Sequence, residues 1–403
     1  MTPLDLNAQL ETLLRGAEGV YSPEELKQRL VGSAETSKPL RVKLGLDPTA
    51  PDIHLGHTVV LRKMRQFQDL GHKAVVIIGD YTARIGDPTG QNTTRPVLND
   101  EQIKANAQTY FEQVGKILLT DPDKLEVQYN GMWLEKLNFA DVLRLAAQMT
   151  VARMLERDTF ALRYKDGVPI SLHEFMYPLM QAYDSVCIQA DVELGGSDQT
   201  FNNLCGRDIQ RAYGQKPQIV IVMPILVGLD GVQKMSKSKG NYIGVHDAPN
   251  DMFGKVMSIP DKLMDNYFTL LTDLPLGQIR ELTDPAKTHP RKAKAALGKI
   301  IVGMYHGAQA GEAAEAEFDR VFASKENPTD MPEIAFPAGA IGIVDMIIKA
   351  GFAESKGEAR RLVTQNAVSI DGERIAQIDA QVEPKDGAVL RVGKRRFGKI
   401  KVQ

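Results

Sequence analysis

The sequence predicts an α/β protein in which a doubly wound parallel sheet comes first, followed by a helical part and a small α+β part. Short apolar runs at residues 40–44, 74–78 and 219–223 alternate with helical periodicity, which favours parallel strands joined by helices. Glycine-containing turns follow candidate strands at residues 45–57 and 195–199. Because open α/β sheets bind ligands beyond the carboxyl ends of their strands, these turns predict a site on a Rossmann-like sheet.

The totals are those of an ordinary globular chain. Its 403 residues are too many for a single core and predict two or three domains. Hydrophobic residues make up 43% and charged residues 25%, and no apolar run approaches the roughly 20 residues that span a bilayer. We therefore expect no membrane partner, and the polar N-terminus shows no apolar leader segment.

Cysteine content and charge distribution add two expectations. Cys187 and Cys205 are too few for a disulfide framework or a four-cysteine zinc site, and they fit a cytoplasmic location. The net charge of −2 does not indicate nucleic-acid binding, but from Ile341 onward the chain has 12 Lys and Arg against 8 Asp and Glu. The basic part of the chain is therefore its end.

Residues 45–57 join a strand to a helix and hold a dense set of candidate ligands. Backbone N–H groups converge on a phosphate at such a helix start, and His54 and His57 add donors that titrate near pH 7. Gly56 has no side chain, so a flat ring can lie against the backbone there. Asp47 lies just past the strand end. The alternative is a turn whose histidines only cap the helix.

A second signature, Lys-Met-Ser-Lys-Ser, occupies residues 234–238 far downstream. Lys234, Lys237 and Lys239 lie on a loop rich in Ser and Gly, which can close around a triphosphate. Ammonium groups neutralise the charge that develops on a departing pyrophosphate, and small residues allow the loop to move. A solvated surface turn is the alternative for this loop alone, and the histidine signature upstream makes it the weaker one.

A polar stripe is predicted on a helix near residue 180. Tyr177, Gln181 and Asp184 are spaced i, i+4 and i+7, so all three share one face. A solvated face would suit the Gln and the Asp but not the aromatic residue. Asp87, in a turn after a strand, and residues 195–199, at a strand-to-helix junction, add further polar candidates.

Taken together, these stretches resemble the signatures of a class I aminoacyl-tRNA synthetase in its tyrosyl form, and the resemblance covers essentially the whole chain. It implies that ATP and L-tyrosine give tyrosyl-adenylate and pyrophosphate, and that the tyrosyl group then passes to tRNA(Tyr). Mg²⁺ is expected with ATP, but no carboxylate cluster marks a metal site, so no metal ligand is assigned. The tryptophanyl enzymes are the nearest relatives by fold.

The resemblance also implies a role for individual residues. The catalytic residues would be His54, His57, Lys234 and Lys237. The residues that bind ATP or the adenylate would be Gly56, Asp198, Lys237 and Ser238. The residues that bind tyrosine would be Gly45, Asp47, Thr49, Asp87, Tyr177, Gln181, Asp184 and Gln199, with Asp184 accepting the phenolic hydrogen bond.

The domain boundaries that follow are residues 1–243 for the catalytic domain and 244–326 for a helical anticodon-binding domain. A linker at 327–340 and an S4-type RNA-binding domain at 341–403 complete the chain. A bundle with a wet basic face is the alternative for the helical part. The predicted RNA-binding residues are Lys356, Arg360, Arg361, Lys394, Arg395 and Arg396.

In this family a connective insertion, here about residues 90–190, forms a homodimer interface. The sequence shows an apolar helix face in that insertion, made of Val142, Leu145, Ala146 and Met149. Ordinary core packing would give the same pattern, so the homodimer is expected from the resemblance alone.

One position departs from the family pattern. Many members have a Tyr two residues before the first glycine, where it donates to the substrate phenol, and this chain has Lys43. The lysine or a water that it organises donates instead, or Asp184 discriminates alone, or Lys43 has only a structural role and snorkels at a strand end.

Two other functions fit the same fold. A regulatory RNA-binding protein would keep the fold without activity, and the intact histidine and lysine signatures argue against it. An adenylating nucleotidyltransferase would share the ATP signatures, but the polar stripe and the basic C-terminal part favour tyrosine and tRNA.

Overall fold

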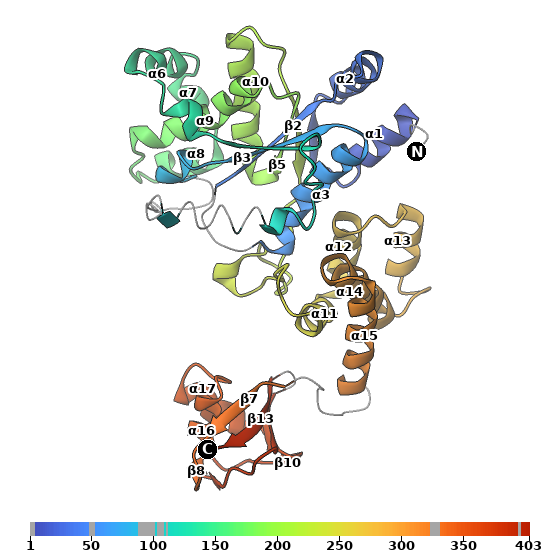
Figure 1. Ribbon diagram of the computed structural model, residues 1–403. Coiled ribbons are helices and arrows are strands. Elements are labelled where there is room, and N and C mark those ends of the chain that lie inside the picture. Colours follow the sequence, from blue (N-terminus) through green and yellow to red (C-terminus); the bar gives the residue numbers. More distant parts are fainter. Residues whose placement is uncertain are drawn as a thin grey trace. The chain divides into compact units, whose positions relative to one another are not determined.

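The computed structural model describes residues 5–47, 53–87, 101–102, 109, 112–322, 331–393 and 396–403. Its contacts divide the chain into two compact units, Met1–Ala308 and Gln309–Gln403 (Figure 1). Within the described residues, no helix is both long and apolar enough to cross a membrane.

The first unit is built on a six-stranded sheet in the order β1-β6-β5-β2-β3-β4. Its strands are β1 (Gly19–Tyr21), β2 (Arg41–Leu46), β3 (Lys73–Ile78), β4 (Leu125–Tyr129), β5 (Val192–Gly196) and β6 (Ile219–Met223). All neighbours are parallel except β1, which runs antiparallel to β6 at the edge. The predicted α/β fold with a doubly wound parallel sheet is confirmed.

Ligands of such a sheet are expected between β2 and β5, where the strand order reverses. From β2 the chain crosses through α3 (Leu55–Asp69) to β3, and from β5 it crosses in the opposite direction through α10 (Thr200–Ala212) to β6. Right-handed crossovers in opposite directions place the two helices on opposite faces of the sheet, as Figure 1 shows. A ligand crevice is therefore expected where the carboxyl ends of β2 and β5 meet.

The apolar runs become buried strands because both faces of the sheet are covered. Every residue of β6 is buried, as are the last five residues of β3. On α3 the apolar residues Val59, Met64 and Phe67 are at most 1% exposed and face the sheet. Gly71 follows α3 with φ +95°, a conformation that a side chain would strain.

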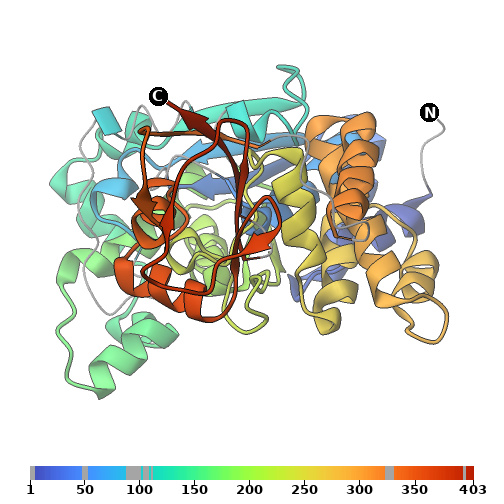
Figure 2. The ribbon, with the colours of Figure 1, turned by 90° about the horizontal axis from the view of Figure 1, so that it is seen from below.

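The other helices that the structure describes with defined bounds in this unit precede, connect or follow the strands. They are α1 (Leu6–Leu14), α2 (Pro23–Thr36), α5 (Gly131–Leu134), α6 (Phe139–Ala146), α7 (Val151–Met154), α8 (Asp158–Lys165), α9 (Leu172–Cys187), α11 (Pro249–Met257), α12 (Met264–Leu271), α13 (Leu276–Thr283) and α14 (Pro290–His306), with 3-10 turns η1 (Thr82–Arg84), η2 (Ser197–Gln199), η3 (Lys237–Lys239) and η4 (Asp261–Leu263). Helix α11 packs along α14, and the two lie side by side in Figure 1 and Figure 2. Helix α15 (Ala308–Phe322) begins at the boundary between the units.

The second unit contains a five-stranded sheet in the order β10-β9-β12-β13-β7 and a two-stranded pair of β11 and β8. Its elements are β7 (Glu333–Phe336), β8 (Ile341–Gly342), α16 (Ile343–Lys349), α17 (Lys356–Thr364), β9 (Val368–Ile370), β10 (Glu373–Arg374), β11 (Gln381–Val382), β12 (Val389–Val392) and β13 (Arg396–Val402). The two helices and the sheet enclose a core that includes Phe336, Ile347 and Leu390. The predicted small α+β part is confirmed.

One strand of this unit comes from residues that the sequence predicts as linker. Residues 333–336 form β7, which pairs in parallel with β13. Phe336 is fully buried, so its aromatic ring draws the segment between Pro332 and Pro337 onto the sheet. The prolines that suggest a linker instead lie on either side of a short edge strand, where proline is tolerated.

Candidate active site

His54 and His57 form a stacked pair at the start of α3. Their ring centroids are 3.9 Å apart, and His54 is the N-cap residue of the helix. The Nδ1 of His54 accepts the Gly56 N–H at 3.2 Å, and the Nδ1 of His57 accepts the His54 N–H at 3.2 Å. With Nδ1 accepting, each neutral ring holds its proton on Nε2 and can donate from there.

Both histidines are neutral at pH 7. Burial, assisted by His57 and Lys237, lowers the pKa of His54 to about 3. Burial, assisted by Lys237 and Lys234, lowers the pKa of His57 to about 4. The rings therefore offer hydrogen bonds rather than charge, and the cations come from the lysines. If the histidines only capped the helix, this would account for the hydrogen bonds that Nδ1 accepts. It would assign no role to the Nε2–H donors.

The histidine turn is held against the segment that follows the lysine loop. The Leu55 N–H donates to the Ile243 carbonyl at 2.9 Å, and the Val245 N–H donates to the Ile53 carbonyl at 3.1 Å. A Cβ added to Gly56 would lie 2.9 Å from Cε1 of His54 and 3.6 Å from Cβ of Met235. The two signatures, far apart in sequence, therefore meet at Gly56.

The lysine loop presents its charges next to the histidines. Met235 is buried and its N–H donates to the Leu226 carbonyl, which anchors the base of the loop. Lys234 is more than half exposed and its Nζ lies 3.8 Å from Oδ2 of Asp198. Lys237 opens the 3-10 turn η3, and its Nζ lies 6.0 Å from the centre of the Tyr242 ring.

Asn241 is a buried residue of this loop that the sequence analysis missed. Its Nδ2 donates to Oδ2 of Asp230 at 2.6 Å and to the Lys234 carbonyl at 3.1 Å, and its Oδ1 accepts the Ser236 N–H at 2.8 Å. A Cβ on Gly228 would lie 2.3 Å from the Asn241 amide, so the chain passes close by. An Asn after a Lys-Ser-Lys-Gly turn is the sequence signal that could have indicated this brace.

The stripe on α9 faces the interior, with each of its three residues held by side chains from other elements. The Tyr177 hydroxyl donates to Oδ2 of Asp47 at 2.6 Å, and Thr82 donates to the other oxygen at 2.9 Å. Burial, followed by the charge of Asp47, raises the pKa of Tyr177 well above its ordinary value, so the phenol stays a donor. Gly79 is required here, because a Cβ would lie 2.0 Å from the Asp47 carboxylate.

Asp184 is 3% exposed and accepts two side-chain hydrogen bonds. Trp133 Nε1 donates to Oδ1 at 2.8 Å, and Asn130 Nδ2 lies 3.3 Å from Oδ2. Burial raises the pKa of Asp184 to about 7, against the opposing effect of Lys43. Asn130 and Trp133 were missed in the sequence because they lie on α5 and its N-cap, remote from every signature.

Asp87 and Gln199 are joined, and the chain of bonds continues to Gln181. Gln199 Nε2 donates to Oδ2 of Asp87 at 2.7 Å, and Asn202 Nδ2 donates to Gln199 Oε1 at 2.9 Å and to Gln181 Oε1 at 3.2 Å. The buried Arg157 also donates to Asp87, at 2.7 Å. The structure thus brings three predicted tyrosine ligands from three elements into one network.

Asp198 and the glycines border this network. Gly45 is the penultimate residue of β2, and Gly196 is the last residue of β5. A Cβ on Gly196 would lie 2.7 Å from Oδ1 of Asp198. Burial raises the pKa of Asp198, and Lys234 opposes that rise. Ser238 is exposed on the loop, with its hydroxyl 2.9 Å from that of Ser236. Thr49 lies outside the described residues.

Lys43 does not reach solvent, so the alternative in which it snorkels at a strand end is wrong. Its side chain is 0% exposed, and its Nζ lies 2.9 Å from Glu193, 2.7 Å from the Gln181 carbonyl and 2.7 Å from the Ser185 hydroxyl. An ammonium group has three donors. All three are directed to protein acceptors, so none of them is directed away from the protein.

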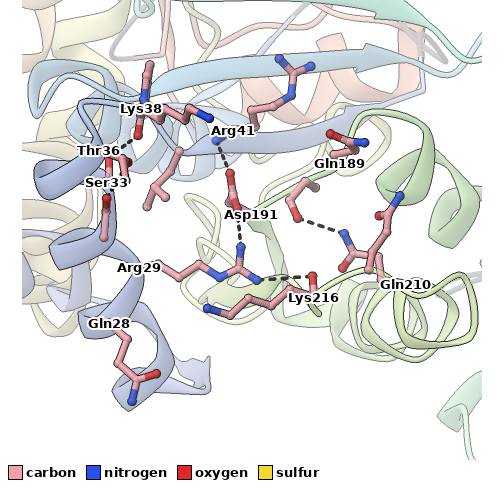
Figure 3. Close-up of a pocket in the computed structure, with 15 residues that line it drawn as sticks. Gln28, Arg29, Ser33, Thr36, Lys38, Arg41, Gln189, Asp191, Gln210 and Lys216 are labelled. Carbon is pink, nitrogen blue, oxygen red and sulfur yellow. Dashed lines mark hydrogen bonds and ion pairs between the residues drawn. The ribbon is translucent and has the colours of Figure 1, made fainter.

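A separate cavity of about 550 Å³ lies at the opposite, amino edge of the sheet (Figure 3). Arg29 of α2 pairs there with Asp191, which also accepts the Arg41 N–H at 3.0 Å. Because ligands of open α/β sheets bind at the carboxyl edge, this cavity is not the amino-acid site. Its ion pair fastens α2 to the start of β5.

The predicted RNA-binding residues lie in the second unit. Lys356, Arg360 and Arg361 are exposed on α17. Arg396 of β13 donates to the Phe352 carbonyl and lies 3.3 Å from Glu358, so it is tied to the start of the same helix. Lys394 and Arg395 are outside the described residues.

Comparison with known proteins assigns the family. Residues 35–323 match the model of tRNA synthetases class I (W and Y), and residues 324–400 match the tyrosine–tRNA ligase SYY-like C-terminal domain. The chain therefore belongs to the class I aminoacyl-tRNA synthetases. Within that class it belongs to the tyrosine–tRNA ligases, as its relatives indicate.

Relatives with that name align along nearly the whole chain. The chain is 54% identical to a tyrosine–tRNA ligase of Moorella thermoacetica over 97% of this chain and 95% of the relative, and 53% identical to that of Carboxydothermus hydrogenoformans over 99% of both. The tyrosyl-tRNA synthetase of Archaeoglobus fulgidus, solved with L-tyrosine, has a TM-score of 0.62 at 24% identity and covers 77% of this chain and all of its own. That likeness supports the fold.

Proposed function

We propose that the crevice between β2 and β5 activates L-tyrosine with ATP and that the chain then transfers the tyrosyl group to tRNA(Tyr). The observation that supports this most strongly is the meeting of the two signatures at Gly56, beside a buried network of Asp, Gln and Tyr side chains. One side of the crevice suits a triphosphate, and the other suits an amino acid with a polar tip.

In the first step the tyrosine carboxylate attacks the α-phosphorus of ATP, the bond to the β-phosphate oxygen breaks, and pyrophosphate leaves with the electron pair. No protein base is needed, because the nucleophile is already ionised. Catalysis is therefore positioning and charge stabilisation. Nε2–H of His54 and His57 donates to the phosphates, while Lys234 and Lys237 neutralise the leaving pyrophosphate. Mg²⁺ enters bound to the ATP phosphates, as part of the substrate.

The buried side holds tyrosine. Asp87, Tyr177 and Gln181 take its ammonium group, with Asp47, Gln199, Gly45 and Thr49 completing the pocket, and Asp184 accepts the phenolic hydrogen bond. A buried acceptor that phenylalanine would leave unpaired rejects that amino acid, and tyrosyl enzymes are themselves the usual example of this effect. Gly56 leaves room for the adenine, Asp198 binds the ribose and Ser238 contacts the phosphates.

In the second step a hydroxyl of the terminal tRNA ribose attacks the adenylate carbonyl, and AMP leaves. The exposed Lys356, Arg360 and Arg361 on α17, with Arg396 beside them, support phosphate contacts by an S4-type domain at residues 341–403. We assign residues 1–243 to catalysis, 244–326 to anticodon binding and 327–340 to the connection, while β7 belongs to the C-terminal sheet.

A homodimer in the cytoplasm completes the proposal. The predicted apolar face is not the exposed one, because Leu145, Ala146 and Met149 pack into a core cluster with α9 and α10. Large apolar side chains elsewhere in the insertion are exposed: Met132, Phe139, Leu143, Val151, Leu162, Tyr164 and Leu172. Exposed apolar residues that form one patch are typical of a surface that a second copy covers, and we propose that these residues belong to such a patch.

Amino-acid-dependent ATP–pyrophosphate exchange without tRNA tests the proposal, with tyrosine, tryptophan and phenylalanine in parallel. We expect exchange with tyrosine and no significant exchange with the other two. Exchange with tryptophan would overturn the substrate while sparing the reaction. A folded protein silent with all three amino acids would contradict the activation step.

A further inference from the structure

Lys43 and Glu193 form an ion pair that the two signatures do not explain. Their side chains are 0% and 1% exposed, and they are direct neighbours in the register of β2 and β5. The pair lies below the crevice, at the point where the strand order reverses. Two charges removed from water in this way need every hydrogen bond satisfied, because desolvation opposes their attraction.

The partners of the pair are concentrated on one turn of α9. Lys43 donates to the Gln181 carbonyl and to the Ser185 hydroxyl, both at 2.7 Å. Glu193 accepts from the Gln181 side chain at 3.3 Å, from Ser185 at 3.3 Å and from Gln218. Both members of the pair therefore hydrogen-bond to the turn from Gln181 to Ser185, through its main chain and its side chains.

That turn also bears the residues proposed to read tyrosine. Gln181 is bound directly, and Asp184 precedes Ser185, so it cannot shift along the helix axis without breaking the Lys43 and Glu193 contacts. We propose that the buried Lys43–Glu193 ion pair is a positioning device for amino-acid selection, which fixes Gln181 and Asp184 against the substrate and sets the preference for tyrosine over phenylalanine. The inference rests on the proposed assignment of Asp184 to the phenol.

This role differs from the direct one suggested by the family pattern. Lys43 occupies the position where many relatives have a phenol donor, yet its three N–H groups are directed to Glu193, Gln181 and Ser185. A misplacement of about 1 Å at a reacting or recognising group can lower a rate about 100-fold. An indirect residue can therefore govern selection as strongly as one that touches the substrate.

The charges of the pair act on Asp184 with opposite signs. Lys43 opposes the burial that raises the pKa of Asp184, whereas Glu193 adds to that rise. Trp133 and Asn130 of the α5 region donate to Asp184 and lower its pKa. Asp184 also faces Cys187 and Tyr177 on its own helix, since its charge raises the pKa of each.

The test uses two isosteric substitutions and their combination. Lys43→Met alone leaves a buried carboxylate, and Glu193→Gln alone leaves a buried ammonium group, so either protein can lose stability. The double variant K43M/E193Q leaves neither charge, and its folding is checked by thermal unfolding. We expect it to fold and to lower the ratio of kcat/KM for tyrosine over phenylalanine in pyrophosphate exchange by about 10- to 100-fold. The KM for ATP should stay within about twofold.

A matched control exists just before the start of the same strand, two residues before Glu193. The Arg29–Asp191 pair fastens α2 to the start of β5, next to the cavity at the amino edge of the sheet (Figure 3). The double variant R29M/D191N removes an ion pair from the same sheet without touching α9 at Gln181. It should leave the tyrosine preference unchanged, which separates loss of selection from a general loss of stability.

The pH profile distinguishes positioning from simple support of the fold. In K43M the acid limb of kcat/KM for tyrosine should move to higher pH, and in E193Q it should move to lower pH, because the two charges act on Asp184 with opposite signs. If the pair only supported the fold, the acid limb would move in the same direction in both variants or would move in neither.

The possible outcomes distinguish the role of the Lys43–Glu193 pair from the assignment of Asp184 to the phenol. A folded K43M/E193Q protein with the parent tyrosine preference overturns the role of the pair. If Asp184→Asn also keeps that preference, the assignment of Asp184 itself fails. If D184N loses the preference while the double variant keeps it, only the inference about the pair is wrong.

Discussion

The two sides of the proposed active-site crevice differ in the solvent exposure of their charged side chains. On the nucleotide side Lys234 is more than half exposed, and Lys237 and Ser238 lie on a short surface turn. On the amino-acid side Asp184 is 3% exposed and Lys43 fully buried. A triphosphate is recognised by charges that can approach and withdraw, whereas a single hydroxyl is recognised only where water is excluded. On the proposed assignment, burial is the physical basis of selection and exposure is what allows the lysine loop to close on ATP.

The largest predicted effect is that of a substitution at Lys237, on the nucleotide side of the crevice. Lys237→Ala should lower the rate of tyrosyl-adenylate formation about 100- to 1,000-fold, because it removes a charge that acts on the departing pyrophosphate. The dissociation constant for tyrosine should change less than about threefold. Rapid-quench single turnovers and equilibrium dialysis measure the two quantities. Lys239→Ala, on the same turn, is the control, and an equally large effect there would contradict a specific role for Lys237.

The next largest effect is expected at Asp184. Asp184→Asn should lower kcat/KM for tyrosine by about 10- to 100-fold while leaving that for phenylalanine nearly unchanged, since one hydrogen bond to a charged group is lost. Exchange assays with both amino acids measure the ratio. A uniform loss with both substrates would mean that Asp184 supports the fold of the pocket rather than reading the phenol.

Acidity should affect the two sides differently. Burial raises the pKa of Asp184 to about 7, so kcat/KM for tyrosine should fall up to about tenfold per pH unit below that value as the acceptor becomes protonated. The KM for ATP should not follow, because His54 and His57 remain neutral well below pH 7. A profile that is flat from pH 6 to 8 would contradict the role of an ionised Asp184.

The same titration acts with the opposite sign on folding. Between the ordinary pKa of 3.8 and about 7, folded Asp184 binds more protons than the unfolded chain does. Its contribution to the free energy of unfolding therefore falls as the pH rises through that window. Comparing D184N with the parent by urea unfolding at pH 5 and pH 8 isolates this contribution.

A smaller effect is expected at Asn241. Asn241→Ala removes the donors to Asp230 and Lys234 and leaves the Ser236 N–H without its acceptor. We expect adenylate formation to slow about tenfold and the KM for ATP to rise, with the KM for tyrosine unchanged. Single-turnover measurements at several ATP concentrations separate the two changes. Equal increases in both KM values would show a general defect instead of a brace specific to the loop.

The smallest effect is expected in the second unit. Arg360→Ala should weaken tRNA binding a few-fold and reduce the salt dependence of binding by about one counterion, because one phosphate contact is lost. Filter binding across a salt series measures the slope. Pyrophosphate exchange without tRNA is the control and should not change.

The part of the site that could be predicted from the sequence was local. His54 and Gly56 lie on one turn, and Lys234 and Lys237 on another, so the sequence alone predicted that each pair lies together, while their proposed roles came from the family resemblance. The i, i+4 and i+7 spacing likewise put the three stripe residues on one face of α9.

The rest depends on pairing between distant segments. Trp133 and Asn130 reach Asp184 from α5, Arg157 reaches Asp87 from the N-cap of α8, and Glu193 reaches Lys43 across two strands. Nothing in the local sequence distinguishes these residues from other polar residues. Residues 333–336 illustrate the same limit for the fold, since only β13 gives them a strand partner.

The central claim is that selection and chemistry are performed by different, separately removable groups. Its most direct test measures tyrosine binding without ATP and single-turnover adenylate formation at saturating tyrosine, in D184N and K237A side by side. We predict that D184N binds tyrosine about 10- to 100-fold more weakly, with a much smaller change in the turnover rate. K237A should show the reverse. If both variants lose binding and rate in equal proportion, the two sides of the crevice do not act separately and the account is wrong.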